Sequence, residues 1–180
     1  MSSSGGCVVW LTGRPSSGKS TLARLAFEAL RARGREACVL DGDAVRKALV
    51  PSPGYDETGR DAFYRSLANL AALLAGQGLV VLVPATAHQR SYREHARTIA
   101  PRFIEVYVDA PPEEAARRDS KGLYAASRGG EVRNVLGADL AYEPPLAAEV
   151  RVGGGKEPAA VERILALVGR SGQTIGCSGS

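Results

Sequence analysis

Continuous apolar runs alternate along the chain with segments whose apolar residues recur every three or four positions. Residues 7–12, CVVWLT, form such a run, which is typical of a strand covered on both faces of a sheet. Residues 19–33 then place apolar side chains at helical spacing, and Gly34 provides a stop signal. The first unit is therefore predicted to be a strand, a loop and a helix.

The same alternation continues to the end of the chain. Further strands are predicted at residues 36–43, 78–86, 103–110 and 148–152. Helices are predicted at residues 44–50, 60–75, 90–100 and 158–168, and another is expected to open within 111–118. The helix at 90–100 is polar in sequence. Strands that alternate with helices predict an α/β fold, with a parallel sheet flanked by helices on both faces.

One segment interrupts this rhythm. Residues 119–145 are rich in Gly, Arg and Pro and show little periodicity, as is typical of a lid or a binding loop inserted into a compact domain. With 180 residues the chain is long enough for one core and short for two domains, so we predict a single domain over residues 1–180. Residues 1–6 and 171–180 are expected to be flexible tails.

Composition narrows the class of protein. No apolar run approaches the length of a membrane span, and MSSSGG lacks a signal-peptide pattern, so the expected location is the cytoplasm. Cys7, Cys38 and Cys177 are too few and too widely spaced for a disulfide framework. The net charge is +4, but the arginines are spread along the chain. This pattern favours a small anionic substrate over nucleic acid, and no membrane partner is expected.

A phosphate-binding motif follows the first strand. The sequence GRPSSGKS fits the pattern G-x-x-x-x-G-K-[ST], in which glycines let successive N–H groups face one anion. Lys19 is placed to reach the β- and γ-phosphates, and the Ser20 hydroxyl is placed to bind magnesium. The motif predicts ATP and Mg²⁺ as ligands. The candidate ATP-binding residues here are Gly13, Arg14, Pro15, Ser16, Ser17, Gly18, Lys19, Ser20 and Thr21.

Two carboxylates, Asp41 and Asp43, follow the second predicted strand, where strand ends of an open parallel sheet meet the ligand crevice. We assign Asp43 to metal binding and to proton acceptance from the attacking hydroxyl, and Asp41 to the substrate. An alternative for Asp43 is to cap the helix at 44–50. The run VVLVPAT carries no terminal acid, unlike the corresponding strand of many ATPases. A small-molecule kinase is therefore favoured over an ATPase motor.

In combination, these motifs are more specific. The segments VVWLTGRPSSGKSTLA, VLDGDAVR, GY followed by Arg60, GLVVLV, FIEVYVDAP, RDSKGLY and YEPP resemble the adenylylsulfate kinase family in order and spacing, over roughly residues 7–152. That family transfers the γ-phosphoryl group of MgATP to the 3′-hydroxyl of adenylyl sulfate and produces PAPS. The resemblance implies the P-loop NTPase fold with a lid segment. By the same analogy it implies a homodimer.

The resemblance also implies roles for individual residues. Asp43 is the acid beside the accepting hydroxyl, Arg46 and Arg60 meet the anionic phosphosulfate, and Tyr55 takes the place of a ring that stacks on the substrate adenine. The alternative for the arginines is a solvated helix position, and for Tyr55 a loop anchor. In the lid, Arg118 is assigned to ATP binding, and Arg118 and Lys121 help neutralise the transferring phosphoryl group. The resemblance implies that the lid stretch of Lys121, Gly122, Leu123 and Tyr124 closes over the substrate and binds it.

Three positions depart from the family pattern, and all three belong to the acceptor half. Phe63 replaces a substrate-binding asparagine, Ala87 replaces a serine, and Val135 replaces a second ring expected to contact the adenine. Phe63 is a candidate replacement ring, and Val135 stays a candidate contact. Two alternatives to adenylylsulfate kinase follow. The first is a related kinase for another hydroxyl compound, and the second is a non-catalytic ATP-binding regulatory module.

Overall fold

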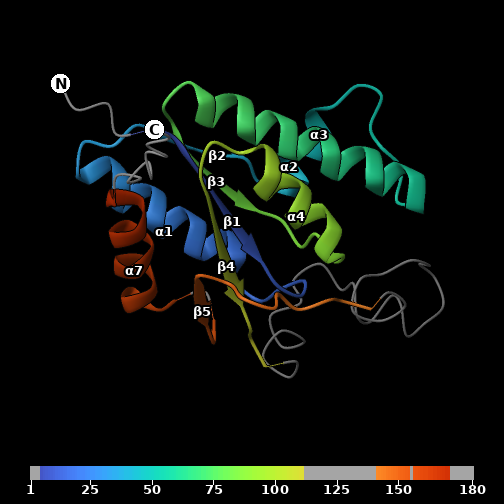
Figure 1. The fold of residues 1–180 in the computed structure, drawn as a ribbon. Helices are drawn as coiled ribbons and strands as arrows, with labels where there is room; N and C mark the ends of the chain where they lie inside the picture. The colour runs from blue at the N-terminus through green and yellow to red at the C-terminus, as the bar shows by residue number, and fades with distance from the viewer. Residues whose placement is uncertain (1–4, 112–140, 155, 171–180) are drawn as a thin grey trace, which may run out of the picture.

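The computed structural model describes residues 5–111, 141–154 and 156–170 of the chain (Figure 1). The elements in this part of the chain are β1 (Cys7–Thr12), α1 (Lys19–Ala32), β2 (Ala37–Val39), α2 (Gly42–Ala48), α3 (Glu57–Gly76), β3 (Val80–Pro84), α4 (Arg90–Ile99), β4 (Phe103–Val108), β5 (Val150–Val152) and α7 (Pro158–Gly169).

The strands form one sheet in the order β2-β3-β1-β4-β5, and every neighbouring pair is parallel. In the central strand, Val9 lies opposite Leu82 of β3 and Ile104 of β4. The predicted α/β fold with a parallel sheet is therefore confirmed. Because the strands are parallel, their carboxyl ends share one edge, and the loops that follow β1, β2 and β3 gather there.

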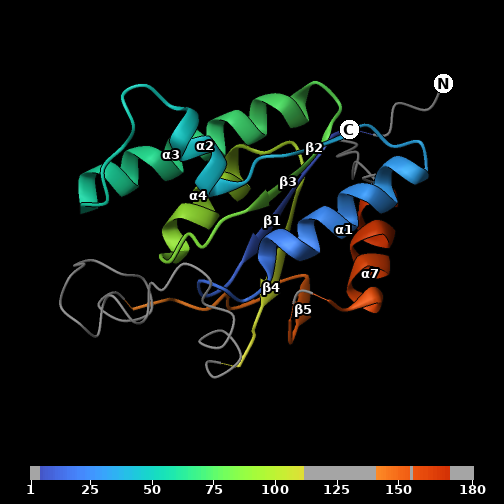
Figure 2. The same ribbon diagram turned by 180° about the vertical axis from the view of Figure 1, so that it is seen from behind.

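Helices cover both faces of the sheet, as predicted (Figures 1 and 2). Successive side chains of a strand point to opposite faces, so β1 contributes to two hydrophobic clusters. Val9 and Leu11 belong to the cluster with α1 and α7. Val8 and Trp10 belong to the cluster with α3 and α4. These two clusters hold β1 and the loop that follows it in a fixed position.

The second cluster offers a direct test of the fold. Leu67 of α3 is fully buried, whereas Leu73 of the same helix is 61% exposed. We expect Leu67→Ala to lower the free energy of unfolding by about 2–5 kcal/mol because it leaves a cavity. Leu73→Ala should change it by less than about 1 kcal/mol. Chemical denaturation of both variants measures the difference, and equal losses would contradict the assigned packing of α3.

Several element boundaries differ from the sequence prediction, and the caps explain two of them. β2 ends at Val39, before the predicted residue 43, because the Asp41 carboxylate caps α2 by accepting from the Asp43 and Ala44 N–H groups. α3 begins at Glu57, three residues before the predicted start, because Asp56 accepts from Gly59 N–H at 2.9 Å. The predicted polar helix at 90–100 is observed as α4, but it buries Tyr92, Arg93 and Ala96.

Some predictions fall outside the described residues. These are the rest of the helix expected at 111–118, most of the lid at 119–145, Cys177 and most of the two tails. The assignment of residues 1–180 to one domain stays a prediction. Within the described ranges, no helix combines the length and the apolar character that a membrane crossing requires.

Candidate active site

The phosphate-binding loop lies between β1 and α1, at the carboxyl edge of the sheet. Gly13 has a φ of 151°, and a Cβ atom there would lie 2.3 Å from the Val108 carbonyl oxygen of β4. Gly18 is the N-cap of α1 with a φ of 101°. Both positions therefore require glycine, and the loop ends on the positive end of a helix, where phosphate is stabilised.

Lys19 lies over its own loop. Its Nζ donates to the carbonyl oxygens of Gly13 at 3.0 Å and Arg14 at 2.7 Å. These contacts hold the ammonium group next to the backbone that would surround a polyphosphate. The buried Ser17 hydroxyl has no hydrogen-bond partner among the described residues. A hydroxyl donor and a cation in such a loop fit a phosphate ligand.

Asp41 links the phosphate-binding loop to the second strand. Its Oδ2 accepts from the Ser20 hydroxyl at 2.8 Å, and its Oδ1 accepts from the Asp43 and Ala44 N–H groups. Gly42 is buried, and a Cβ atom there would lie 3.2 Å from Ala85 Cβ. The glycine between the two acids thus lets α2 start against the end of β3.

This arrangement changes the interpretation of Asp41 and Asp43. The N-cap alternative considered for Asp43 applies to Asp41 instead, because Asp41 occupies the extended N-cap position. Asp43 lies in the first turn of α2 and is exposed. Asp41, which we had assigned to the substrate, is the acid in contact with the predicted magnesium ligand Ser20.

Arg46 lies on α2 and is only 7% exposed. Its Nη1 donates to the carbonyl oxygens of Pro53 and Gly54 at 3.0 and 2.9 Å. Its guanidinium carbon lies 4.6 Å from the Tyr55 ring centroid and 3.9 Å from the Phe63 ring centroid. Arg46 therefore fixes the loop that carries Tyr55, which is 64% exposed and open to a flat ligand.

Phe63 was a candidate replacement ring for the substrate, and the structure corrects this expectation. The side chain is 2% exposed and belongs to the core cluster of α3 and α4. It lies on the same face of α3 as Tyr64 and Leu67, so the helical spacing could have revealed its burial. Its effect on the site passes through Arg46, whose guanidinium rests on the ring.

Arg60 and Ala87, the remaining described acceptor-side residues, are both buried. Burial lowers the pKa of Arg60, which lies on α3. Ala87 N–H donates to the Tyr64 hydroxyl at 3.1 Å. Ala87 also has a φ of 41°, which is uncommon for a residue other than glycine and is often found at functional sites.

The loop after β3 is held by Arg93, a residue that sequence analysis missed. Its side chain is 2% exposed, and its Nε donates to Glu105 Oε1 of β4 at 2.8 Å. The two terminal nitrogens donate to the carbonyl oxygens of Ala87, Gln89 and Glu143. The one signal available was Glu105, an acid inside the apolar strand FIEVYV, which requires a buried partner.

Replacement of Arg93 by methionine is expected to destabilise the fold strongly. The variant leaves the Glu105 carboxylate and several carbonyls without their buried donor, a loss of about 3–5 kcal/mol. Arg65→Met is a matched control, because Arg65 forms an exposed pair with Asp61 at 2.9 Å and should contribute less than about 1 kcal/mol. Urea unfolding of both variants makes the comparison, and similar midpoints would disprove this role of Arg93.

Thr12, the last residue of β1, was also missed. Its hydroxyl lies 2.7 Å from the Thr86 carbonyl oxygen and 2.9 Å from the Tyr142 hydroxyl. Burial raises the pKa of Tyr142 to about 12, so its hydroxyl is protonated at neutral pH. Glu143 N–H donates to the His88 carbonyl oxygen at 2.8 Å. Residues 142 and 143 are thus joined to the start of the phosphate-binding loop and to the loop after β3.

The lid residues assigned from the sequence, together with Val135, lie outside the described residues. The five lid residues concerned are Arg118, Lys121, Gly122, Leu123 and Tyr124. The described residues contain no cluster of three or more His, Cys, Asp or Glu side chains suited to hold a metal ion. A magnesium ion bound with nucleotide does not need such a cluster, because phosphates and water supply most of its ligands.

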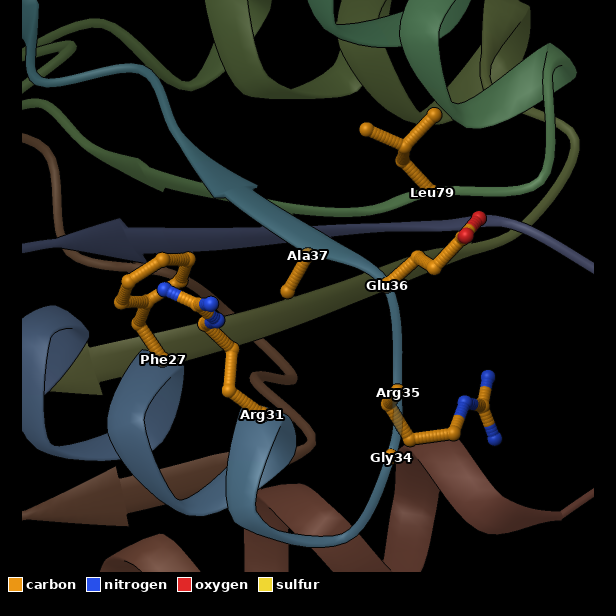
Figure 3. Close-up of a pocket in the computed structure, with 7 residues that line it drawn as sticks. All are labelled: Phe27, Arg31, Gly34, Arg35, Glu36, Ala37 and Leu79. Atoms are coloured by element: carbon orange, nitrogen blue, oxygen red, sulfur yellow. The ribbon is translucent and has the colours of Figure 1, made fainter.

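A separate hollow lies at the opposite edge of the sheet, where β2 begins (Figure 3). Arg31 of α1 and Leu79, which precedes β3, contribute to its walls, and the Arg31 guanidinium lies 5.7 Å from the Phe27 ring centroid. None of the site residues assigned from the sequence lines it. It is therefore distinct from the site at the carboxyl edge.

The fold and the site at its carboxyl edge define a P-loop kinase. Residues 5–153 match the family model described as adenylylsulphate kinase. The chain is 37% identical over 179 residues to the adenylyl-sulfate kinase of Paraburkholderia xenovorans, covering 98% of this chain and all of the relative. It is 41% identical over 147 residues to the probable adenylyl-sulfate kinase of Pyrococcus abyssi, covering 82% and 84% of the two chains.

The structure of the Mycobacterium tuberculosis APS kinase CysC in complex with AMPPNP and APS is similar as well, with a TM-score of 0.84 and 36% identity over 91% of this chain and 97% of that one. A gluconokinase from Sinorhizobium meliloti, with a TM-score of 0.57 and 22% identity, shares the fold alone over 91% of each chain. The chain belongs to the adenylylsulphate kinase family.

Proposed function

We propose that this protein is an adenylylsulfate kinase, which transfers the γ-phosphoryl group of MgATP to the 3′-hydroxyl of adenylyl sulfate and forms PAPS. The observation that carries the proposal is the contact between Ser20 of the phosphate-binding loop and Asp41 after β2, which joins the donor loop to the segment bearing Asp43. Family membership supports the choice of substrate.

The phosphate-binding loop provides the donor half of the mechanism. The N–H groups of the loop and the start of α1 bind the phosphates, and Lys19 neutralises charge on the γ-phosphoryl group as it moves. Ser20 and Asp41 offer the oxygen ligands that Mg²⁺ prefers, Ser20 directly and Asp41 through water or directly. A magnesium ion held by these residues would supply positive charge that offsets the negative charge of the phosphates during transfer.

The residues around α2 and α3 provide the acceptor half. Asp43 accepts or orients the proton of the 3′-hydroxyl, Arg60 binds an anionic group of the substrate, and Tyr55 stacks on its adenine. Arg46 supports Tyr55 from behind, through the contacts with the loop and the ring described above. Together these residues hold the hydroxyl in line with the γ-phosphorus atom, and positioning supplies much of phosphoryl-transfer catalysis.

A single-turnover assay tests the proposal. Enzyme in excess over adenylyl sulfate is mixed with ATP and Mg²⁺, and the 3′-phosphorylated product is separated and quantified. We expect stoichiometric PAPS and ADP, with no product when Mg²⁺ is chelated. ATP binding without product at high enzyme concentration would disprove the proposal and favour a regulatory ATP-binding module.

A second candidate is a kinase of the same fold for a different anionic hydroxyl compound. Phe63 motivates it, because a buried ring replaces an asparagine that binds substrate in the family. Ala87 and Val135 are further departures in the same half. A thermal-shift panel in the presence of ADP separates the two candidates, because only the true acceptor adds stabilisation beyond that of ADP. Stabilisation by another hydroxyl compound, and none by adenylyl sulfate, would favour the second candidate.

A further inference from the structure

We propose that His88 binds the acceptor, with its Nδ1 forming a hydrogen bond to an oxygen of the anionic substrate. This inference rests on the proposed function and adds a residue that selects the substrate. His88 lies in the loop between β3 and α4 and is 5% exposed. Its Nδ1 is buried and has no hydrogen-bond partner among the described residues.

The backbone of this loop is held on several sides. The Thr12 hydroxyl donates to the Thr86 carbonyl, Tyr64 accepts from Ala87 N–H, Arg93 donates to the Ala87 carbonyl, and the His88 carbonyl accepts from Glu143 N–H. These contacts come from β1, α3, α4 and the segment at 141–145. The loop therefore cannot easily shift to give Nδ1 a partner within the protein.

An unpartnered buried nitrogen in a fixed loop is costly. A buried polar group without a hydrogen bond destabilises a protein by about 1–3 kcal/mol, and such groups are rare in native structures. The position of His88 explains why the cost is tolerated, because the residue follows Ala87 and lies near Arg60 on the acceptor side. A substrate oxygen that reaches Nδ1 would remove this cost when it binds.

The charges around His88 favour an anionic oxygen over a cation. The positive charges of Arg60 on α3 and Arg93 on α4 lower the pKa of His88, and the negative charge of Glu143, in the segment at 141–145, raises it. Arg93 is paired with Glu105, and Glu143 accepts from Arg90 N–H at 2.8 Å. Tyr92 meets the imidazole edge-on, with ring centroids 5.7 Å apart, and burial raises the pKa of its hydroxyl, so it brings no charge.

Burial lowers the pKa of His88, and Arg60 lowers it further, so the free imidazole is neutral at pH 7. A neutral Nδ1–H donates to a substrate oxygen without introducing a buried charge. An anion bound at Nδ1 would oppose both effects and raise the pKa of His88. The chain has only two histidines, so His95 serves as an internal reference.

The first test is kinetic and uses His88→Phe, with His95→Phe as a matched control on α4. We expect His88→Phe to raise KM for adenylyl sulfate on the order of tenfold, as the loss of one hydrogen bond to a charged group predicts, with KM for ATP unchanged. The ligand-free Tm of this variant should equal or exceed that of the wild type, because an apolar ring removes the unpartnered group. His95→Phe should leave both KM values unchanged.

The second test is an NMR titration of the imidazole signals of the wild type with ADP, with and without adenylyl sulfate. We expect the pKa of His88 to rise when adenylyl sulfate binds. Two results would overturn the His88 inference alone, provided that the wild type is active. The first is a KM for adenylyl sulfate that His88→Phe leaves unchanged, and the second is a His88 pKa that does not change when adenylyl sulfate is added. A wild type that neither binds nor phosphorylates adenylyl sulfate would overturn the proposed function and this inference together.

Discussion

Lys19→Ala is expected to lower kcat on the order of a thousandfold while the protein stays folded. The Nζ group lies over the phosphate-binding loop, held by the Gly13 and Arg14 carbonyl oxygens, where it would meet the phosphates. Negative charge moves on the γ-phosphoryl group during transfer, and loss of one fixed positive or donor group costs about 10²–10³ in rate or more. Steady-state assay of PAPS formation measures the change.

Lys47→Ala provides the control for this experiment. Lys47 lies in the last turn of α2, carries the same charge and is exposed. Its removal should leave kcat within about twofold, because an exposed charge away from the loop is screened by solvent. A Lys19→Ala enzyme that kept a tenth or more of the wild-type kcat would refute the role of Lys19.

Asp43→Asn should lower kcat about 10²–10⁴-fold, the range of a lost general base, with little change in ATP affinity. Asparagine keeps the shape of the side chain but cannot take the proton of the acceptor hydroxyl. Asp61→Asn is the matched control, because Asp61 forms an exposed pair with Arg65 on α3. Rate constants from single turnovers, together with ATP binding measured by calorimetry, report both quantities.

Comparison with Asp41→Asn separates the two acids. Asp41 accepts from Ser20 and caps α2. Asparagine caps a helix as well as aspartate does, but its amide nitrogen cannot accept from the Ser20 hydroxyl, so Asp41→Asn should shift the magnesium dependence with little change in stability. If Asp43→Asn leaves kcat intact and Asp41→Asn abolishes it, the catalytic role belongs to Asp41. Indifference to both changes would favour a non-catalytic ATP-binding protein.

The fold and the donor loop could be predicted from the sequence because their signals are local. Apolar runs such as residues 7–12 specify buried parallel strands, and Gly13, Gly18 and Lys19 belong to one short motif that can be recognised from neighbouring residues. The structure shows why position 13 is glycine, because a side chain there would clash with the Val108 carbonyl oxygen of β4, almost a hundred residues later in the chain.

The acceptor half could be predicted less well because its contacts join distant segments. Arg93 reads as an exposed residue of a polar helix, yet its partners are Glu105 on β4 and the carbonyl oxygens of Ala87 and Glu143. That Asp41, and not Asp43, caps α2 and accepts from Ser20 depends on the backbone turn at Asp41, which composition does not reveal. Phe63, in contrast, had a readable signal in the helical spacing of α3.

The hydroxyl of Thr12 has a consequence for how this enzyme could change its substrate. The Thr12 side chain joins the end of β1, where the phosphate-binding loop begins, to the carbonyl of Thr86 and to the Tyr142 hydroxyl. The phosphate-binding loop and the loop after β3 therefore share one anchor. These contacts hold the end of β1 in place relative to the loop after β3 and to Tyr142. Changes at positions 63 and 87 do not remove these Thr12 contacts, so the phosphate-binding loop keeps its anchor while other parts of the site vary.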